Sequence, residues 1–77
     1  MTTLEKFNIL KEQGLSLKFV GNLINIPENA MYKWHVNRQK FNEDRLDKID
    51  KIINSLYDLY LDCEKAKDLN KYEDLTN

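Results

Sequence analysis

A join of only Asn25, Ile26 and Pro27 separates two amphipathic segments within the stretch SLKFVGNLINIPENAMYKW, residues 16–34. Both segments have apolar residues at helical spacing. A connection this short leaves two helices little room to lie antiparallel, so we expect them to cross at a steep angle. The rest of the chain must therefore pack around an angular pair of helices.

Helix signals recur along the whole chain, and no segment alternates apolar and polar residues as a strand does. Glycine occurs only at positions 14 and 21, and proline only at position 27. The sequence predicts an all-α fold of four helices with a long C-terminal helix. At 77 residues, such a domain gains only about 3–5 kcal/mol from its core unless oligomerisation or another device assists it.

The first two predicted helices have local start and stop signals. Thr2 and Glu5 have the spacing of a capping box, and Gly14 is the residue type that most readily ends a helix. Ser16 caps the second helix, and Asn25 ends it because asparagine tolerates the left-handed conformation. The inner face of the first helix is expected to carry Leu4, Phe7 and Leu10, and the apolar stripe of the second Phe19, Val20, Leu23 and Ile24.

The third predicted helix starts at Pro27, whose missing amide hydrogen costs nothing there, and runs to about Asn37. Ile26 is expected to point inward just before it. A tryptophan within an apolar stripe is more often part of a core than a stacking surface. The buried residues of this helix are therefore expected to be Ala30, Met31 and Trp34.

The fourth predicted helix is long for so small a protein. Asn42 caps it, and Glu43 and Asp44 place acids in its first turn. The helical pattern then continues to about Leu69, roughly 40 Å, and residues 70–77 are expected to be frayed. Its main apolar stripe consists of Leu46, Ile49, Ile53, Leu56, Tyr60 and Cys63.

The distal half of this helix has more apolar side chains than the short N-terminal part can cover. We therefore expect a core in residues 1–56, a dimerisation segment in residues 57–69 and the frayed tail. The alternative is that the distal half folds back on the first helix. The residues expected in a homodimer interface are Leu56, Tyr57, Tyr60, Leu61 and Cys63.

Charge is distributed unevenly along the chain. The formal net charge is −1, but residues 1–41 carry six bases and three acids, a net +3, whereas residues 42–77 carry six bases and ten acids, a net −4. A basic N-terminal part suits a polyanionic partner, although a solvated acidic helix is the simpler reading of the remainder.

The composition argues against catalysis and metal binding. The only cysteine, Cys63, excludes an intramolecular disulfide, and the only histidine, His35, excludes an ordinary protein-only zinc site. Nothing brings these two residues together as a nucleophilic pair, and no glycine-rich phosphate loop is present. No stretch reaches the roughly 18 apolar residues that span a bilayer. We expect a cytoplasmic protein that is not an enzyme and needs no cofactor or metal.

Residues 17–36 resemble the helix-turn-helix of small Cro-like and repressor-like DNA-binding proteins of phages and mobile elements, and are similar in layout to anti-CRISPR-associated repressors. Gly21 occupies the small-residue position, where alanine is commoner, and Asn25 the turn position, where glycine is usual. The apolar positions fall on Val20, Ile24, Ile26, Met31 and Trp34. With its flanking helices the resemblance covers roughly residues 2–55 and implies a helix-turn-helix domain.

This resemblance implies that residues 28–36 form a recognition helix in the major groove of double-stranded DNA. Side chains not needed for the core would read base edges, by hydrogen bonds or by contact with thymine methyl groups. These base-reading candidates are Glu28, Asn29, Tyr32, Lys33 and Val36. The candidates for phosphate contacts are Ser16, Lys18, Asn37, Arg38, Gln39 and Lys40.

Two functions follow from these observations. The first is a dimeric, sequence-specific DNA-binding transcriptional regulator, a repressor of phage or mobile-element type. The second is a protein-interaction module on a helix-turn-helix scaffold, such as an antirepressor or an inhibitor of a host protein, which the low net charge and the acidic fourth helix favour.

Overall fold

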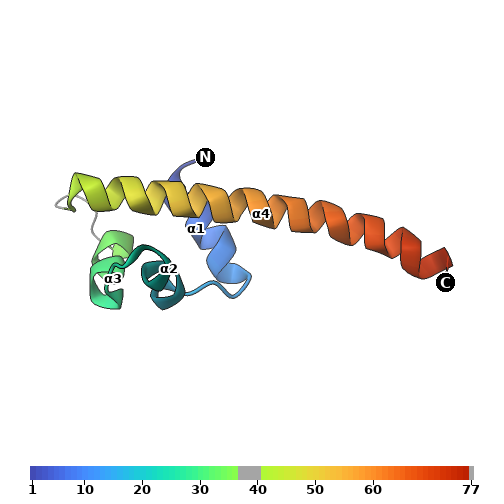
Figure 1. The fold of residues 1–77 in the computed structure, drawn as a ribbon, viewed down its shortest axis with the longest axis horizontal. Coiled ribbons are helices and arrows are strands. Elements are labelled where there is room, and N and C mark those ends of the chain that lie inside the picture. Colours follow the sequence, from blue (N-terminus) through green and yellow to red (C-terminus); the bar gives the residue numbers. More distant parts are fainter. Residues whose placement is uncertain (37–40, 77) are drawn as a thin grey trace.

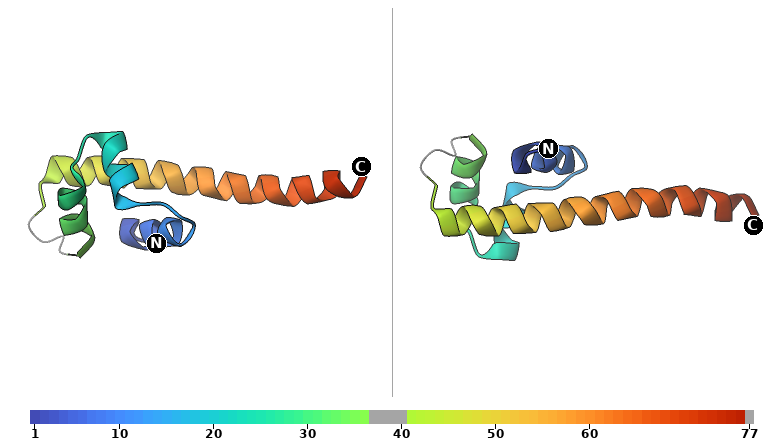
Figure 2. Two further views of the ribbon diagram at one scale, coloured as in Figure 1. Left: turned by 90° about the horizontal axis from the view of Figure 1, so that it is seen from below. Right: turned by 90° about the horizontal axis from the view of Figure 1, so that it is seen from above.

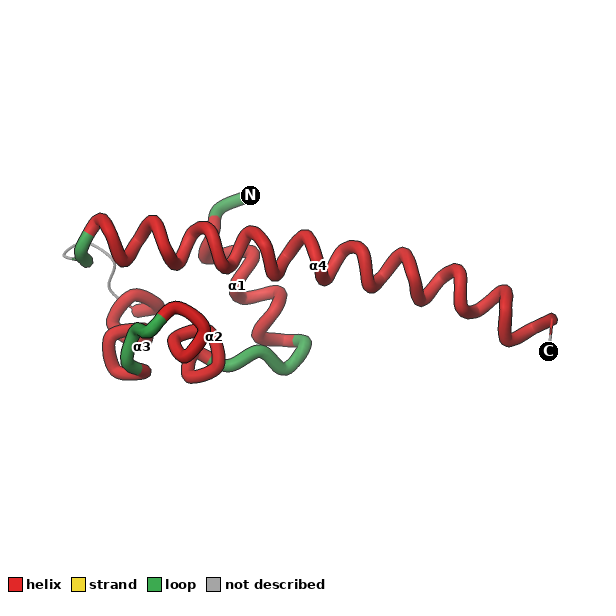
Figure 3. Tube along the Cα trace, in the orientation of Figure 1, coloured by secondary structure: helices red, strands yellow, loops and turns green. Residues whose placement is uncertain are grey.

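The structure is a computed structural model that describes the backbone of residues 1–36 and 41–76 and the side chains of these residues through Lys67. Within this part, the chain forms α1 (Thr3–Glu12), α2 (Leu17–Ile24), α3 (Glu28–Val36) and α4 (Glu43–Thr76), and no strand (Figure 1, Figure 3). The predicted all-α class is confirmed.

Side chains and a glycine define the ends of α1 as the sequence predicts. The Thr2 hydroxyl oxygen accepts a hydrogen bond from the Glu5 N–H at 3.2 Å, and the Glu5 carboxylate accepts one from the Thr2 N–H at 3.0 Å. Hydrogen bonding of the Glu5 carboxylate to the backbone N–H of Thr2, and to its side chain, lowers the pKa of Glu5 below its usual value. Gly14 follows the helix with φ of +106°, a conformation that favours glycine.

The predicted caps of α2 are also confirmed. The Ser16 hydroxyl oxygen accepts a hydrogen bond from the Phe19 N–H at 3.0 Å. Asn25 ends the helix in the left-handed region, with φ 58° and ψ 40°. The chain turns there and enters α3 after only Ile26 and Pro27.

The prediction that Pro27 starts the third helix is wrong by one position. α3 begins at Glu28, and the Pro27 carbonyl accepts the hydrogen bond from the Met31 N–H at 3.0 Å, which makes proline the capping residue. Neither position needs an amide donor, so proline is compatible with both. α3 ends at Val36, and Asn37 lies outside the described residues.

The start of α4 is as predicted, but its end is not. The Asn42 side-chain oxygen accepts a hydrogen bond from the Asp44 N–H at 2.8 Å. The helix continues through Thr76, so residues 70–76 are helical and the expected end near Leu69 is wrong. This segment contains neither glycine nor proline, the residues that stop helices most effectively.

α4 is the long axis of the molecule, whose extents are 53 × 22 × 17 Å. α1 lies along one side of its first half, and α2 passes beneath α4 and ends on the other side (Figure 2). α3 lies beside α2 near the start of α4. The C-terminal part of α4 extends past all three helices (Figure 1).

The core forms where the three short helices meet α4. Phe7 and Trp34 pack edge to face with ring centroids 5.5 Å apart, and Trp34 is 2% exposed, so its predicted place in the core is confirmed. The other buried apolar residues are Leu10, Val20, Ile26, Ala30, Met31, Ile49 and Ile53.

The predicted apolar stripe of α2 is wrong for half of its members. Phe19 and Leu23 are 51% and 48% exposed, while Val20 is fully buried. At 100° per residue, Phe19 and Leu23 lie far around the helix from Gly21, whose side packs against α3. Apolar residues extend around more of α2 than its neighbours cover.

Candidate functional site

Gly21 brings the join between α2 and α3 directly onto α2. A Cβ atom on Gly21 would collide with the carbonyl oxygen of Ile26 and would lie 3.0 Å from Cγ of Met31. The Ile26 N–H donates a hydrogen bond to the Gly21 carbonyl at 2.9 Å, which holds the join in place. The absence of a side chain at this position therefore sets how closely α3 approaches α2.

The base-reading candidates are all exposed and lie together on the outer face of α3. With Leu17 at the start of α2, they line one open depression of about 600 Å³. Tyr32 and Val36 are each 59% exposed, so their apolar surface faces solvent. We call this surface the α3 face; it consists of Leu17, Glu28, Asn29, Tyr32, Lys33 and Val36.

The α3 face combines polar end groups with apolar surface. Glu28 brings a carboxylate, Lys33 an amine and Asn29 an amide, and the Asn29 side-chain oxygen accepts a hydrogen bond from the Ala30 N–H at 3.0 Å. These groups can donate hydrogen bonds, accept hydrogen bonds and make apolar contacts with the surface of a partner. Among the described residues, no three or more His, Cys, Asp or Glu side chains are grouped to hold a metal.

A second depression, of about 570 Å³, adjoins the α3 face where α3 meets the start of α4. Asn29 and Lys33 line it from α3, and Asn42 and Arg45 line it from the other side. The sequence analysis missed Arg45 as a candidate for phosphate contacts. A basic residue one turn after the Asn42 cap, which itself follows a basic segment, is a recognisable signal for such a contact. The structure adds a guanidinium group next to Lys33.

Only part of the predicted phosphate-contact set falls within the described residues. Ser16 and Lys18 are exposed at the start of α2, next to Leu17 of the α3 face. The Ser16 hydroxyl also caps α2. The remaining members of that set, Asn37, Arg38, Gln39 and Lys40, lie outside the described residues.

The predicted dimer residues separate into two groups. Leu56, Tyr57 and Tyr60 are half-buried against the core of their own chain, whereas Leu61 is 40% exposed and Cys63 is also exposed.

α1 accounts for part of this burial. The Lys6 amine of α1 donates a hydrogen bond to the Asn54 side-chain oxygen at 2.7 Å. The same amine lies 5.5 Å from the centre of the Tyr57 ring. The middle of α4 thus packs on α1, a contact that the alternative interpretation expected for the whole distal half, while the described side chains from Leu61 to Lys67 are exposed.

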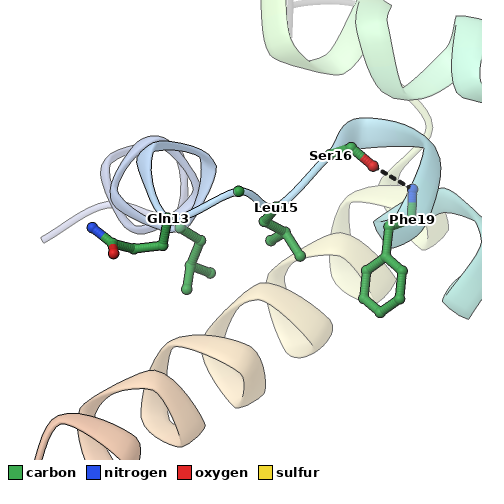
Figure 4. Close-up of a pocket in the computed structure, with 6 residues that line it drawn as sticks. Gln13, Leu15, Ser16 and Phe19 are labelled. Atoms are coloured by element: carbon green, nitrogen blue, oxygen red, sulfur yellow. Dashed lines mark hydrogen bonds between the residues drawn. The ribbon is translucent and has the colours of Figure 1, made fainter.

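Another depression, which the sequence did not predict, lies where the chain passes from α1 to α2 (Figure 4). It measures about 470 Å³ and contains apolar side chains from both helices and their loop. In Figure 4, Leu15 and Phe19 point to the same side of this connection. Its lining residues are Leu10, Gln13, Gly14, Leu15, Ser16 and Phe19.

Comparisons with protein families, with curated proteins and with solved structures find no match to this chain. Within the part of the chain that the structure describes, no helix is long and apolar enough to cross a membrane.

Proposed function

We propose that α2, the join and α3 act as a helix-turn-helix that binds double-stranded DNA, and that the protein is a transcriptional regulator of repressor type. The observation that carries this proposal is the gathering of the predicted base-reading side chains on the α3 face. The left-handed turn at Asn25 and the side-chain-free contact at Gly21 support it, since both permit the tight join that the motif needs.

In this proposal, α3 enters the major groove and its side chains read base edges. Lys33 donates to the acceptors of guanine, and the amide of Asn29 pairs with adenine. Val36 and Tyr32 contact thymine methyl groups. Glu28 accepts from cytosine or serves only as an acid at a helix start.

Phosphate contacts flank this surface on two sides. Ser16 and Lys18 lie at the start of α2, and Arg45 lies beyond α3. Polar and basic side chains in these positions fix the orientation of the protein on DNA but do not read the nucleotide sequence. The net +3 of residues 1–41 favours this use, and the acidic remainder of the chain belongs mainly to α4.

Selection of bound fragments from a random duplex pool tests the proposal. Lys33→Ala and Asn29→Ala should keep the helical content and lose discrimination among duplexes, by about 1–3 kcal/mol for each lost base contact. Lys18→Ala should weaken binding to all duplexes alike and reduce the salt slope by about one unit. Lys67→Ala removes the same charge from exposed α4 and is the matched control, expected to bind as the parent does.

A protein partner is the second candidate, because Leu17, Tyr32 and Val36 make much of the α3 face apolar. Salt distinguishes the two functions. Affinity for DNA falls linearly with salt on logarithmic axes, whereas a mainly apolar protein interface responds weakly. Absence of any duplex binding at low salt would remove the DNA proposal and favour the protein-interaction module.

A further inference from the structure

The C-terminal part of α4 has an apolar side that the described chain does not cover. α1 and α2 contact the first half of the helix, and every described side chain from Leu61 to Lys67 is exposed. Leu59 is 57% exposed, more than the 40% of Leu61. This exposed part is continuous with the segment that packs on the core.

The uncovered apolar side lies in line with the side of α4 next to α2. Ile52 and Ser55 line a depression of about 270 Å³ with Ile24 of α2. Residues spaced by seven lie almost directly above one another on a helix, displaced by only about 20°. Leu59 and Ala66 therefore continue the line of Ile52, and Cys63 lies beside them. We call Ile52, Ser55, Leu59, Cys63 and Ala66 the α4 stripe.

We propose that the α4 stripe pairs antiparallel with the α4 stripe of a second copy of this chain, around a two-fold axis at Leu59. A two-fold interface must be complementary to itself. Positions 52 and 66 are equally distant from Leu59, and so are positions 55 and 63. The axis therefore sets the large Ile52 against the partner's small Ala66, and Ser55 against the partner's Cys63.

The same axis gives the greatest possible overlap of the two helices. Leu59 lies at the middle of α4, which extends from residue 43 to residue 76. Full overlap of about 50 Å, over a strip about 10 Å wide, sets an upper limit of roughly 500 Å² on each chain, or roughly 1,000 Å² in total, because α2 already covers part of this side at Ile52. This limit reaches the lower bound for a specific interface. The depression at Ile24 and Ile52 receives the partner's Ala66.

Charge favours an antiparallel over a parallel pair. Residues 57–77 carry six acids and three bases, a net −3. Antiparallel pairing places the acidic end of one chain beside residues 42–56 of the other, which carry four acids and three bases, a net of only −1. Parallel pairing would place the two acidic ends together, so it has the stronger repulsion.

Dimerisation by the α4 stripe does not require DNA binding, but it bears on that function. Arg45 lies about 21 Å along α4 from Leu59, so the two Arg45 residues of the dimer are roughly 42 Å apart along the helix axis. This separation is of the same order as the roughly 34 Å between successive turns of the major groove. Only this consequence rests on the proposed function.

Sedimentation of the full chain without DNA, from about 1 to 100 µM, tests the interface. We expect a reversible monomer–dimer equilibrium. Leu59→Lys should raise the dimer dissociation constant by about 30-fold or more, as expected for a central apolar contact. Leu61→Lys is the matched control, because Leu61 lies half a turn around α4 from Ile52, and it should change the constant by less than about 3-fold.

Two outcomes of sedimentation would overturn the inference. One is a parent chain that remains monomeric at the highest concentration, and the other is a Leu61→Lys variant that dissociates as readily as Leu59→Lys. Neither site is buried, so circular dichroism should show that both variants remain folded. A dimer without duplex affinity would contradict the proposed function alone, and a monomer that binds duplex DNA would contradict the dimer alone.

Oxidation of a Ser55→Cys variant tests the orientation. The antiparallel pair should form a disulfide between position 55 and the partner's Cys63, whereas a parallel pair would link equal positions. Peptide mapping distinguishes these products. The parent, with Cys63 alone, should give little cross-linked dimer, and a predominance of links between equal positions would overturn the antiparallel arrangement.

Discussion

The two halves of α4 have the same apolar spacing but different surroundings. In the first half, Ile49 and Ile53 are fully buried beneath the three short helices. In the second half, Cys63 continues the stripe of Ile49 and Ile53, Leu59 continues the line of Ile52, and both side chains are exposed. A periodic pattern therefore predicts which side of a helix is apolar, whereas burial depends on whether another element lies against that side.

The difference also separates two sources of helix stability. The N-terminal half of α4 is stabilised by the core, while the C-terminal half, as a single chain, has mainly its own backbone hydrogen bonds and ion pairs such as Glu64–Lys67 at 3.6 Å. Exposed pairs of this kind contribute little. A second copy that covered the α4 stripe would supply the missing packing.

The largest effect is expected from removing the centre of the core. Trp34→Ala deletes a side chain that is 2% exposed and packs on Phe7, and should cost about 3–5 kcal/mol. A domain this small would then be largely unfolded. Thermal denaturation followed by circular dichroism measures it, with exposed Tyr32→Ala as control. An unchanged melting temperature would contradict the core position.

The contact between α2 and the join gives the next largest effect. Gly21→Ala places a Cβ against the carbonyl oxygen of Ile26, a backbone atom that cannot rotate away, and should cost about 1–3 kcal/mol. Asn22→Ala, an exposed neighbour on the same helix, is the control. Urea denaturation of both variants checks the prediction, which fails if Gly21→Ala is as stable as its control.

Shortening α4 locates the boundary between its two halves. A chain that ends at Leu56 loses Tyr57 and Tyr60, which pack against the core, and should be less stable by about 1–2 kcal/mol than a chain that ends at Cys63. Urea denaturation at low protein concentration, where a dimer is dissociated, makes the comparison. Equal stabilities would place the boundary at Leu56, as the sequence suggested.

The smallest effect is expected at the start of α1. Because the hydrogen bonds from Thr2 lower the pKa of Glu5 in the folded chain, ionised Glu5 stabilises the fold above its usual value of 4.5. This contribution is lost as the pH falls through the lowered pKa. Melting temperatures of the parent and Glu5→Gln should differ at neutral pH and converge in acid, while Glu12→Gln, outside the capping box, serves as control.

The sequence predicted local features well because they depend on neighbouring residues. The capping box at Thr2 and the left-handed Asn25 are set within a few positions of the chain. The exposure of Phe19 was not predictable in this way, since it depends on which side of α2 meets α3 and α4. The end of α4 was missed because no residue near Leu69 marks a stop.

The residues of the candidate site also divide into those that local sequence predicts and those that depend on tertiary packing. Helical spacing alone was sufficient to put Lys33 and its neighbours on one exposed side of α3. Arg45 was missed because the local signal, a basic residue one turn after the Asn42 cap, does not show that the start of α4 shares a depression with Lys33 of α3. The grouping of predicted residues on the α3 face still leaves their DNA contacts as a prediction.

Burial of the only tryptophan has an optical consequence. Trp34 lies in the core, remote in sequence from the uncovered part of α4, and the indole ring packs against Phe7. Its fluorescence emission should therefore be blue-shifted in the folded chain and should report on the core alone. Far-ultraviolet circular dichroism is dominated by α4, the longest helix. The two spectroscopic signals together should distinguish melting of the C-terminal helix from unfolding of the core in a single unlabelled sample.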